Sequence, residues 1–183
     1  MSRAIKDPIP KAVVDALWRQ AATATPKEAH AWMENLMQRQ PALEHYLFSA
    51  DEHFAPSDSR GLIFVTGFLI WHVLSQNAKI RRQVAQEDLT AVQKSNQNWI
   101  YELEAGASLT RCDLLEKLSD NCRQKPLWRT VLATLMEESS IANDLKDANR
   151  RLALLHLKTV LDCLDNLVAD ADQKANSRSA AQK

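Results

Sequence analysis

Four residues in the middle of the chain combine large aromatic rings with polar atoms. Trp71 and His72 lie in the most apolar stretch of the sequence, Gly61 to Leu74, and Asn96 and Trp99 follow later in the chain. Large rings beside a few polar groups are typical of pockets that bind small molecules. The sequence therefore predicts a ligand-binding site at Trp71, His72, Asn96 and Trp99 for a small apolar or aromatic ligand. The alternative is that the tryptophans pack the core and that His72 is hydrogen-bonded to a carbonyl or carboxylate.

Two aspartate pairs suggest a different chemistry. Asp144 and Asp147, and likewise Asp162 and Asp165, are spaced three residues apart, which places both carboxylates of a pair on one face of a helix. Such pairs can hold Mg²⁺ for a diphosphate substrate. We expect both pairs on the polar outer face of the last helix, together with Lys158, where water solvates them. We accordingly assign no metal ligand, no catalytic residue and no cofactor, and the sequence favours a non-catalytic protein over an enzyme.

The apolar stretch that contains Trp71 and His72 predicts a central buried helix over about 61–82. Between Leu62 and Leu74 only Thr66, Gly67 and His72 interrupt the apolar residues, and a helix without a polar face must be surrounded by other elements. The run is too short to span a membrane, which takes about 20 apolar residues. A strand is the alternative, but the neighbouring segments have helical periodicity. Gly67 leaves room for another helix to approach closely.

Apolar residues at helical spacing predict further helices on both sides of this stretch. Thr25, Pro26 and Glu28 form a capping box with proline at the first helical position. A break between the central helix and the next one is expected near 86–90, where capping residues recur. The expected helices cover about 11–22, 26–38, from 41, 90–104, after 110, from 126, and about 143–169.

Composition excludes several classes of protein. The chain has 23 basic and 23 acidic residues, so no surface for nucleic acid is indicated. Its three glycines make a backbone cradle for phosphate groups improbable and favour helices. The three cysteines lack zinc or disulfide spacing, and residues 1–11 lack the apolar core of a secretory signal. We expect a cytoplasmic protein with reduced cysteines and without a membrane partner.

The fold predicted from these patterns is all-α. We expect a single-domain helical bundle of about seven or eight helices, with an extended lead-in at 1–9, the helical domain at 10–170 and a disordered tail at 171–183 that has no large apolar residue. The leading functional hypothesis is a protein-interaction or regulatory protein that self-associates as a homo-oligomer. The alternatives are a small-ligand-binding protein with an aromatic pocket near Trp71 and His72, and an Mg²⁺-dependent enzyme that uses the aspartate pairs.

Overall fold

The fold was determined as a computed structural model. It describes residues 7–52, 61–77, 80, 82–105, 117, 119–120, 122–137 and 148–180. The described residues form seven helices and no strand, so the predicted all-α class is confirmed. In chain order the helices are α1 (Lys11–Ala22), α2 (Pro26–Arg39), α3 (Pro41–Glu52), α4 (Leu62–Asn77), α5 (Gln86–Ala105), α7 (Lys125–Glu137) and α8 (Ala148–Ala180).

The start of α2 and the boundary between α2 and α3 follow from capping residues and proline. The backbone N–H of Glu28 donates to the Thr25 hydroxyl at 3.3 Å, and the Glu28 carboxylate accepts the Thr25 backbone N–H at 2.8 Å. The predicted capping box is therefore confirmed. The Thr25 hydroxyl and backbone N–H hold the pKa of Glu28 below its ordinary value. Pro41 ends α2 and opens α3, because proline is accommodated in the first turn of a helix but not in its interior.

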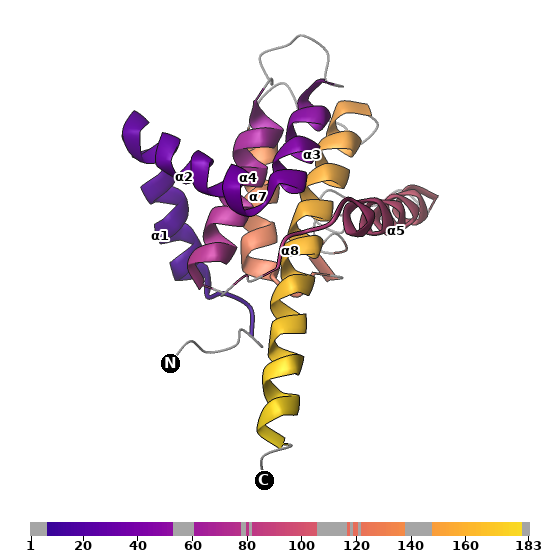
Figure 1. Ribbon diagram of the computed structural model, residues 1–183. Coiled ribbons are helices and arrows are strands. Elements are labelled where there is room, and N and C mark those ends of the chain that lie inside the picture. Colours follow the sequence, from indigo (N-terminus) through magenta and orange to yellow (C-terminus); the bar gives the residue numbers. More distant parts are fainter. Residues whose placement is uncertain are drawn as a thin grey trace.

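Helix α4 is buried on nearly all sides. It packs against α1, α2, α3, α7 and α8, and Figure 1 shows it behind α2, beside α7 and α3. A side chain at Gly67 would overlap the methyl groups of Leu47 on α3. Gly67 therefore does mark a close approach of a neighbouring helix, although it is a leucine side chain, and not a helix backbone, that fills the space.

The predicted end of this helix, at about residue 82, is wrong. Helix α4 ends at Asn77, whose side-chain amide donates to the Val73 carbonyl at 2.8 Å. The segment that follows is held by Gln40, which donates to the Arg82 carbonyl at 3.1 Å and accepts the Val84 N–H at 2.8 Å. These bonds satisfy the backbone of a non-helical connection, so the chain can leave the helix here.

Helix α5 starts directly after this connection. The Asp88 carboxylate accepts the Ala85 N–H at 3.3 Å and the Arg82 guanidinium at 2.5 Å, as acidic groups in a first turn commonly do. The chain does break between α4 and α5, but the predicted position near 86–90 is wrong: residues 86–90 already belong to α5, and the described non-helical residues lie before them. Two separate helices, α4 and α5, occupy the region.

Helix α8 packs against α5, α4 and α3. Its C-terminal part projects beyond the other helices (Figure 1). It continues to Ala180, past the predicted end at Ala169 and into the segment predicted to be a disordered tail. Frequent alanines account for the helical backbone. Residues 171–183 have no large apolar residue, and an isolated helix without apolar packing is marginal in water. The domain limits 1–9, 10–170 and 171–183 stay predictions.

The core joins residues from all seven helices. The five tryptophans lie on five different helices. Trp71 and Trp128 are buried, and Trp18, Trp32 and Trp99 pack partly buried against the core. Within the described ranges, no helix combines the length and the apolar character needed to cross a lipid bilayer.

Candidate functional site

The four residues predicted to bind a ligand lie on two helices and have different neighbours. Trp71 and His72 are on α4, and Asn96 and Trp99 are on α5. The rings around the first pair come from α2 and α4, whereas the partners of the second pair come from α8. The four residues of the predicted ligand site therefore lie in two different local environments.

His72 is the polar residue of the α4 environment. Its ring is 3% exposed, lies 4.5 Å from the Trp32 ring on α2 and stacks on Phe68 at 6.0 Å. Trp71 packs against the same Phe68 at 6.1 Å. Among the described residues no group hydrogen-bonds the buried Nε2 atom of His72. Burial lowers the pKa of His72, since a charged ring would lose its solvation. The expected carbonyl or carboxylate partner for this nitrogen is not found in the described part of the chain.

Asn96 belongs to the α5–α8 environment. The side-chain amide of Asn96 donates to the Asp162 carboxylate at 3.1 Å and approaches the Thr159 hydroxyl at 3.5 Å. Asn96 is therefore bonded to side chains of α8, and its predicted role in binding a ligand stays a prediction. The neighbouring Trp99 ring lies 5.7 Å from the Lys158 ammonium, close enough for a cation–π contact.

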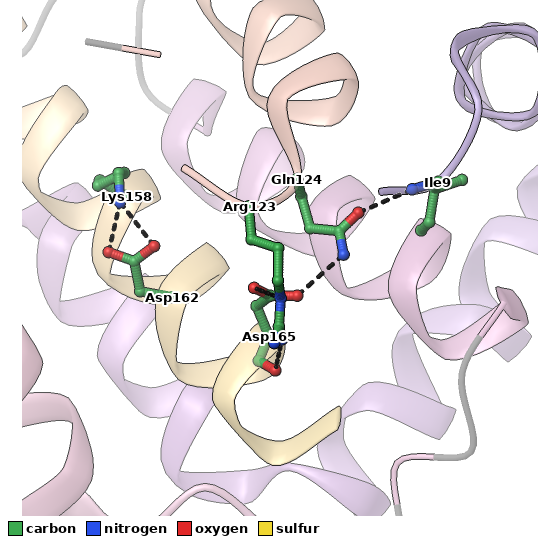
Figure 2. A network of polar contacts seen from close by, with 6 residues as sticks. All are labelled: Ile9, Arg123, Gln124, Lys158, Asp162 and Asp165. Atoms are coloured by element: carbon green, nitrogen blue, oxygen red, sulfur yellow. Dashed lines mark hydrogen bonds and ion pairs between the residues drawn. The ribbon is translucent and has the colours of Figure 1, made fainter. Parts of the chain in front are cut away.

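Lys158 and Asp162 form a buried ion pair on α8. The Lys158 Nζ donates to the two carboxylate oxygens of Asp162 at 2.6 and 2.5 Å (Figure 2). The Lys158 side chain is only 3% exposed and that of Asp162 is 24% exposed. Lys158 is therefore not a solvated residue of an outer face, and the expectation that placed it there is wrong. A buried ammonium needs such a partner because an isolated charge is costly to bury.

Asp165 joins three parts of the chain. Its carboxylate accepts Arg123 Nε at 2.7 Å and the Gln124 amide at 2.9 Å. The Gln124 side-chain oxygen in turn accepts the backbone N–H of Ile9 at 2.9 Å. Figure 2 shows this chain of contacts running from α8 through Gln124 to the N-terminal segment. Asp165 is buried, so its expected place on the outer face is wrong as well.

A polar cleft of about 350 Å³ opens between α5 and α8. It is lined by Val92, Ser95, Asn96, Arg123, Asp162, Asp165 and Asn166. The sequence indicated Asn96 and the aspartates, but it gave no signal for Arg123 or Gln124, whose partners are distant in the chain.

The aspartates of the cleft are poorly suited to hold Mg²⁺. Each carboxylate already accepts a cationic side chain of this protein, Lys158 for Asp162 and Arg123 for Asp165. A metal ion would have to displace these partners and leave a buried ammonium unpaired. Asp144 and Asp147 lie outside the described residues. In the described part of the chain no group of three or more metal-ligating side chains occurs.

Two of the three cysteines are buried free thiols, as expected for reduced cysteines. Burial raises the pKa of Cys122 to about 11 and that of Cys163 to about 12. A thiol with a raised pKa carries little nucleophilic thiolate at neutral pH, which disfavours covalent chemistry at either position. Cys112 lies outside the described residues.

Comparisons with known proteins add no relative. No protein-family model, no curated protein and no solved structure matches the chain significantly. We therefore infer the function from the contacts within the chain.

Proposed function

We propose that this protein is a non-catalytic interaction protein that self-associates through an apolar surface on α3 and α4. The observation that carries the proposal is the exposure of two large apolar side chains there. Phe48 on α3 is 42% exposed and Val65 on α4 is 53% exposed. The Phe48 ring packs on Phe64, the neighbour of Val65 in the chain, at 4.4 Å. We call Phe48, Phe64 and Val65 the α3–α4 patch.

The position of Val65 strengthens this argument. Residues 62, 65 and 69 share one face of α4, because they are three and seven positions apart. Leu62 and Leu69 are only half-buried, so the apolar surface extends along the helix beyond Val65. Contiguous apolar surface that is left uncovered in a monomer commonly marks a site of protein association. An oligomer that buries it by two-fold symmetry would place the same patch of two copies against each other.

The proposal includes the finer features of the fold predicted from the sequence. In it, α4 is the central helix of a single domain at 10–170, and α8 is a long C-terminal helix that covers α4 and α5. The charge pairs on α8 then serve to fix the helices, because Lys158 and Asp165 bind groups of this chain. A cytoplasmic location is part of the proposal, since reduced cysteines persist in that compartment.

The oligomeric state of matched variants tests the proposal. Val65→Glu puts a charge into the α3–α4 patch, and Tyr101→Glu is the control because Tyr101 on α5 is also a large exposed side chain, at 55%. Sedimentation velocity over a range of concentrations should show an oligomer for the parent protein and for Tyr101→Glu. Val65→Glu should raise the dissociation constant at least about tenfold, which is about 1.4 kcal/mol. A parent protein that stays monomeric at high concentration contradicts the proposal.

One observation favours a second candidate function, the binding of a small aromatic ligand near Trp71 and His72. The buried Nε2 of His72 has no hydrogen-bond partner among the described residues, and it lies among the rings of Trp32 and Phe68. Buried polar atoms are nearly always paired, and a bound molecule is one way to pair this one. Native mass spectrometry of the purified protein should then show a retained mass that His72→Phe loses. Equal native and denatured masses would remove this candidate.

A further inference from the structure

We propose that His72 makes the contact between α2 and α4 an acid-sensitive latch, in which a proton on the His72 ring releases α2 from α4. The geometry consists of one ring pair between the helices. The His72 ring lies 4.5 Å from Trp32 of α2, with Phe68 stacked on it from α4. The ring is buried, and its Nε2 atom has no hydrogen-bond partner among the described residues.

A proton would turn this favourable contact into an unfavourable one. A neutral imidazole has one donor nitrogen and one acceptor nitrogen, whereas the protonated ring has two donors and a full charge. Burying a charge without a partner costs far more than burying a neutral polar atom. The Trp32 face would offset part of this cost by a cation–π contact. Burial lowers the pKa of His72, because the charged ring would lose its solvation.

The charged groups around α4 do not compensate such a proton. The helices packed against α4 are α1, α2, α3, α7 and α8. Their charged residues with exposed or half-exposed side chains are Lys11, Asp15 and Arg19 on α1, Lys27, Glu28, His30, Glu34 and Arg39 on α2, Glu44 and His45 on α3, and Lys125 and Arg129 on α7. Among the side chains that the structure describes, the other titratable groups of these helices are Tyr46 on α3 and His156, Lys158, Asp162, Cys163 and Asp165 on α8. No hydrogen bond or ion pair of the described chain connects any of them to the His72 ring.

The sign of the pH dependence follows from proton linkage. The closed form holds His72 with a lowered pKa, and the open form gives it the ordinary value of about 6.5. The open form therefore binds more protons below that value. The latch is fully stable above about pH 6.5, and the ratio of closed to open protein falls about tenfold for each pH unit below it. This ratio stops falling once the pH is below the pKa that His72 has in the closed form.

Helix α2 is suited to open separately from the rest of the bundle. Leu36 is its one fully buried residue, and Trp32 and Met33 are only partly buried against the core. Segments with few buried apolar contacts open at lower free energy than the whole domain. Opening would expose Trp32, Met33 and Leu36 together, which is the kind of surface that binds other proteins.

Hydrogen exchange of the full chain tests the latch. The opening constants of amides in α2 and α8, corrected for intrinsic exchange, are compared at pH 7.5, 6.5 and 5.5. We expect the α2 opening constant of the parent protein to rise by up to about fivefold between pH 6.5 and 5.5, and by up to about tenfold between pH 7.5 and 5.5, while that of α8 stays constant. His72→Phe should abolish the rise. His30→Gln is the matched control, because His30 also lies on the α2 side of the molecule but is exposed and pairs with Glu34, and it should behave as the parent.

Three results would overturn the proposal. The first is a rise of the α2 opening constant that persists in His72→Phe. The second is opening of α2 and α8 together, which would be acid unfolding of the whole domain. The third is a His72 pKa at or above 6.5 in an NMR titration of the histidine rings. This titration uses the parent protein and so does not depend on whether a variant folds. A titration below that value, together with the α2-specific rise, supports the latch.

Discussion

Helix α4 and the part of α8 between residues 152 and 168 are both largely buried, but their polar groups are accommodated in opposite ways. On α8 the charges are paired: Lys158 with Asp162, and Asp165 with Arg123 and Gln124. On α4 the buried ring of His72 keeps one nitrogen without a hydrogen bond in the described part of the chain. The first arrangement satisfies polar atoms with partners from other elements, and the second surrounds a polar atom with aromatic rings.

The difference shows what determines the position of each helix. Because a buried charge must have a partner, the charges of α8 determine which segments lie beside it, namely Asn96 of α5, the start of α7 and, through Gln124, the segment at Ile9. Within the described ranges, no charged pair of this kind holds the middle of α4. Its place is determined by shape, with Leu47 of α3 lying against Gly67. The free energy of unfolding should therefore be most sensitive to the loss of polar groups on α8 and to changes of side-chain volume on α4.

Among the single substitutions on α4 and α8, the largest effect is expected for Asp165→Asn. The substitution keeps the shape of the side chain but removes the charge that Arg123 Nε binds at 2.7 Å. Breaking a fully buried pair costs about 3–5 kcal/mol. Because the Arg123 side chain is 37% exposed and can regain water, we expect a loss of about 2 kcal/mol in the free energy of unfolding, measured by urea denaturation at pH 7.5.

Asp120→Asn is the control for this prediction. Asp120 pairs with Lys125 at 3.7 Å, and both side chains are largely exposed. Exposed pairs contribute about 0–1 kcal/mol, so the control should lose little. Equal losses in the free energy of unfolding of the two variants would show that the buried pair on α8 stabilises the protein no more than an exposed pair does.

A smaller effect is expected for Gly67→Ala on α4. The added methyl group would overlap Leu47, and overpacking of a core costs about 1–3 kcal/mol. Alanine regains about 1 kcal/mol of helix propensity over glycine. The free energy of unfolding should therefore fall by about 1 kcal/mol in the same denaturation experiment.

A double-mutant cycle sharpens that prediction. Leu47→Ala alone should cost about 2–5 kcal/mol by leaving a cavity. Combined with Gly67→Ala, it should cost clearly less than the sum of the two single changes, because the new methyl group enters the space that Leu47 vacates. Additive costs would show that Leu47 and Gly67 do not constrain each other.

The sequence predicts the parts of this structure that depend on neighbouring residues. The limits of α1, the capping box of Thr25 and Glu28 and the all-α class follow from spacing, caps and composition. The end of α4 was missed because it depends on Gln40, which bonds the backbone at Arg82 and Val84 from a distant part of the chain. Periodicity carries no information about such a contact.

The same reason explains the error on the face of α8. A run with Lys158, Asp162 and Asp165 resembles a solvated surface, and only Asn96 and Arg123, far away in the sequence, make it a buried one. Asn96 was the useful signal, because a polar residue on an apolar stripe requires a partner. The predicted ligand site joined Asn96 to His72 because both are polar residues among apolar ones, a property that does not distinguish a paired group from an unpaired one.

The smallest effect is expected for His72→Phe at pH 7.5, where the parent ring is neutral. A buried polar atom without a hydrogen bond costs about 1–3 kcal/mol, and phenylalanine removes that cost while keeping the contacts with Trp32 and Phe68. The somewhat different shape of the new ring offsets part of the gain. We expect the free energy of unfolding to stay equal or to rise by up to about 1 kcal/mol, measured by urea denaturation. A loss of more than 1 kcal/mol would mean that the nitrogen does have a partner, and α4 would then resemble α8 in how it holds its polar groups.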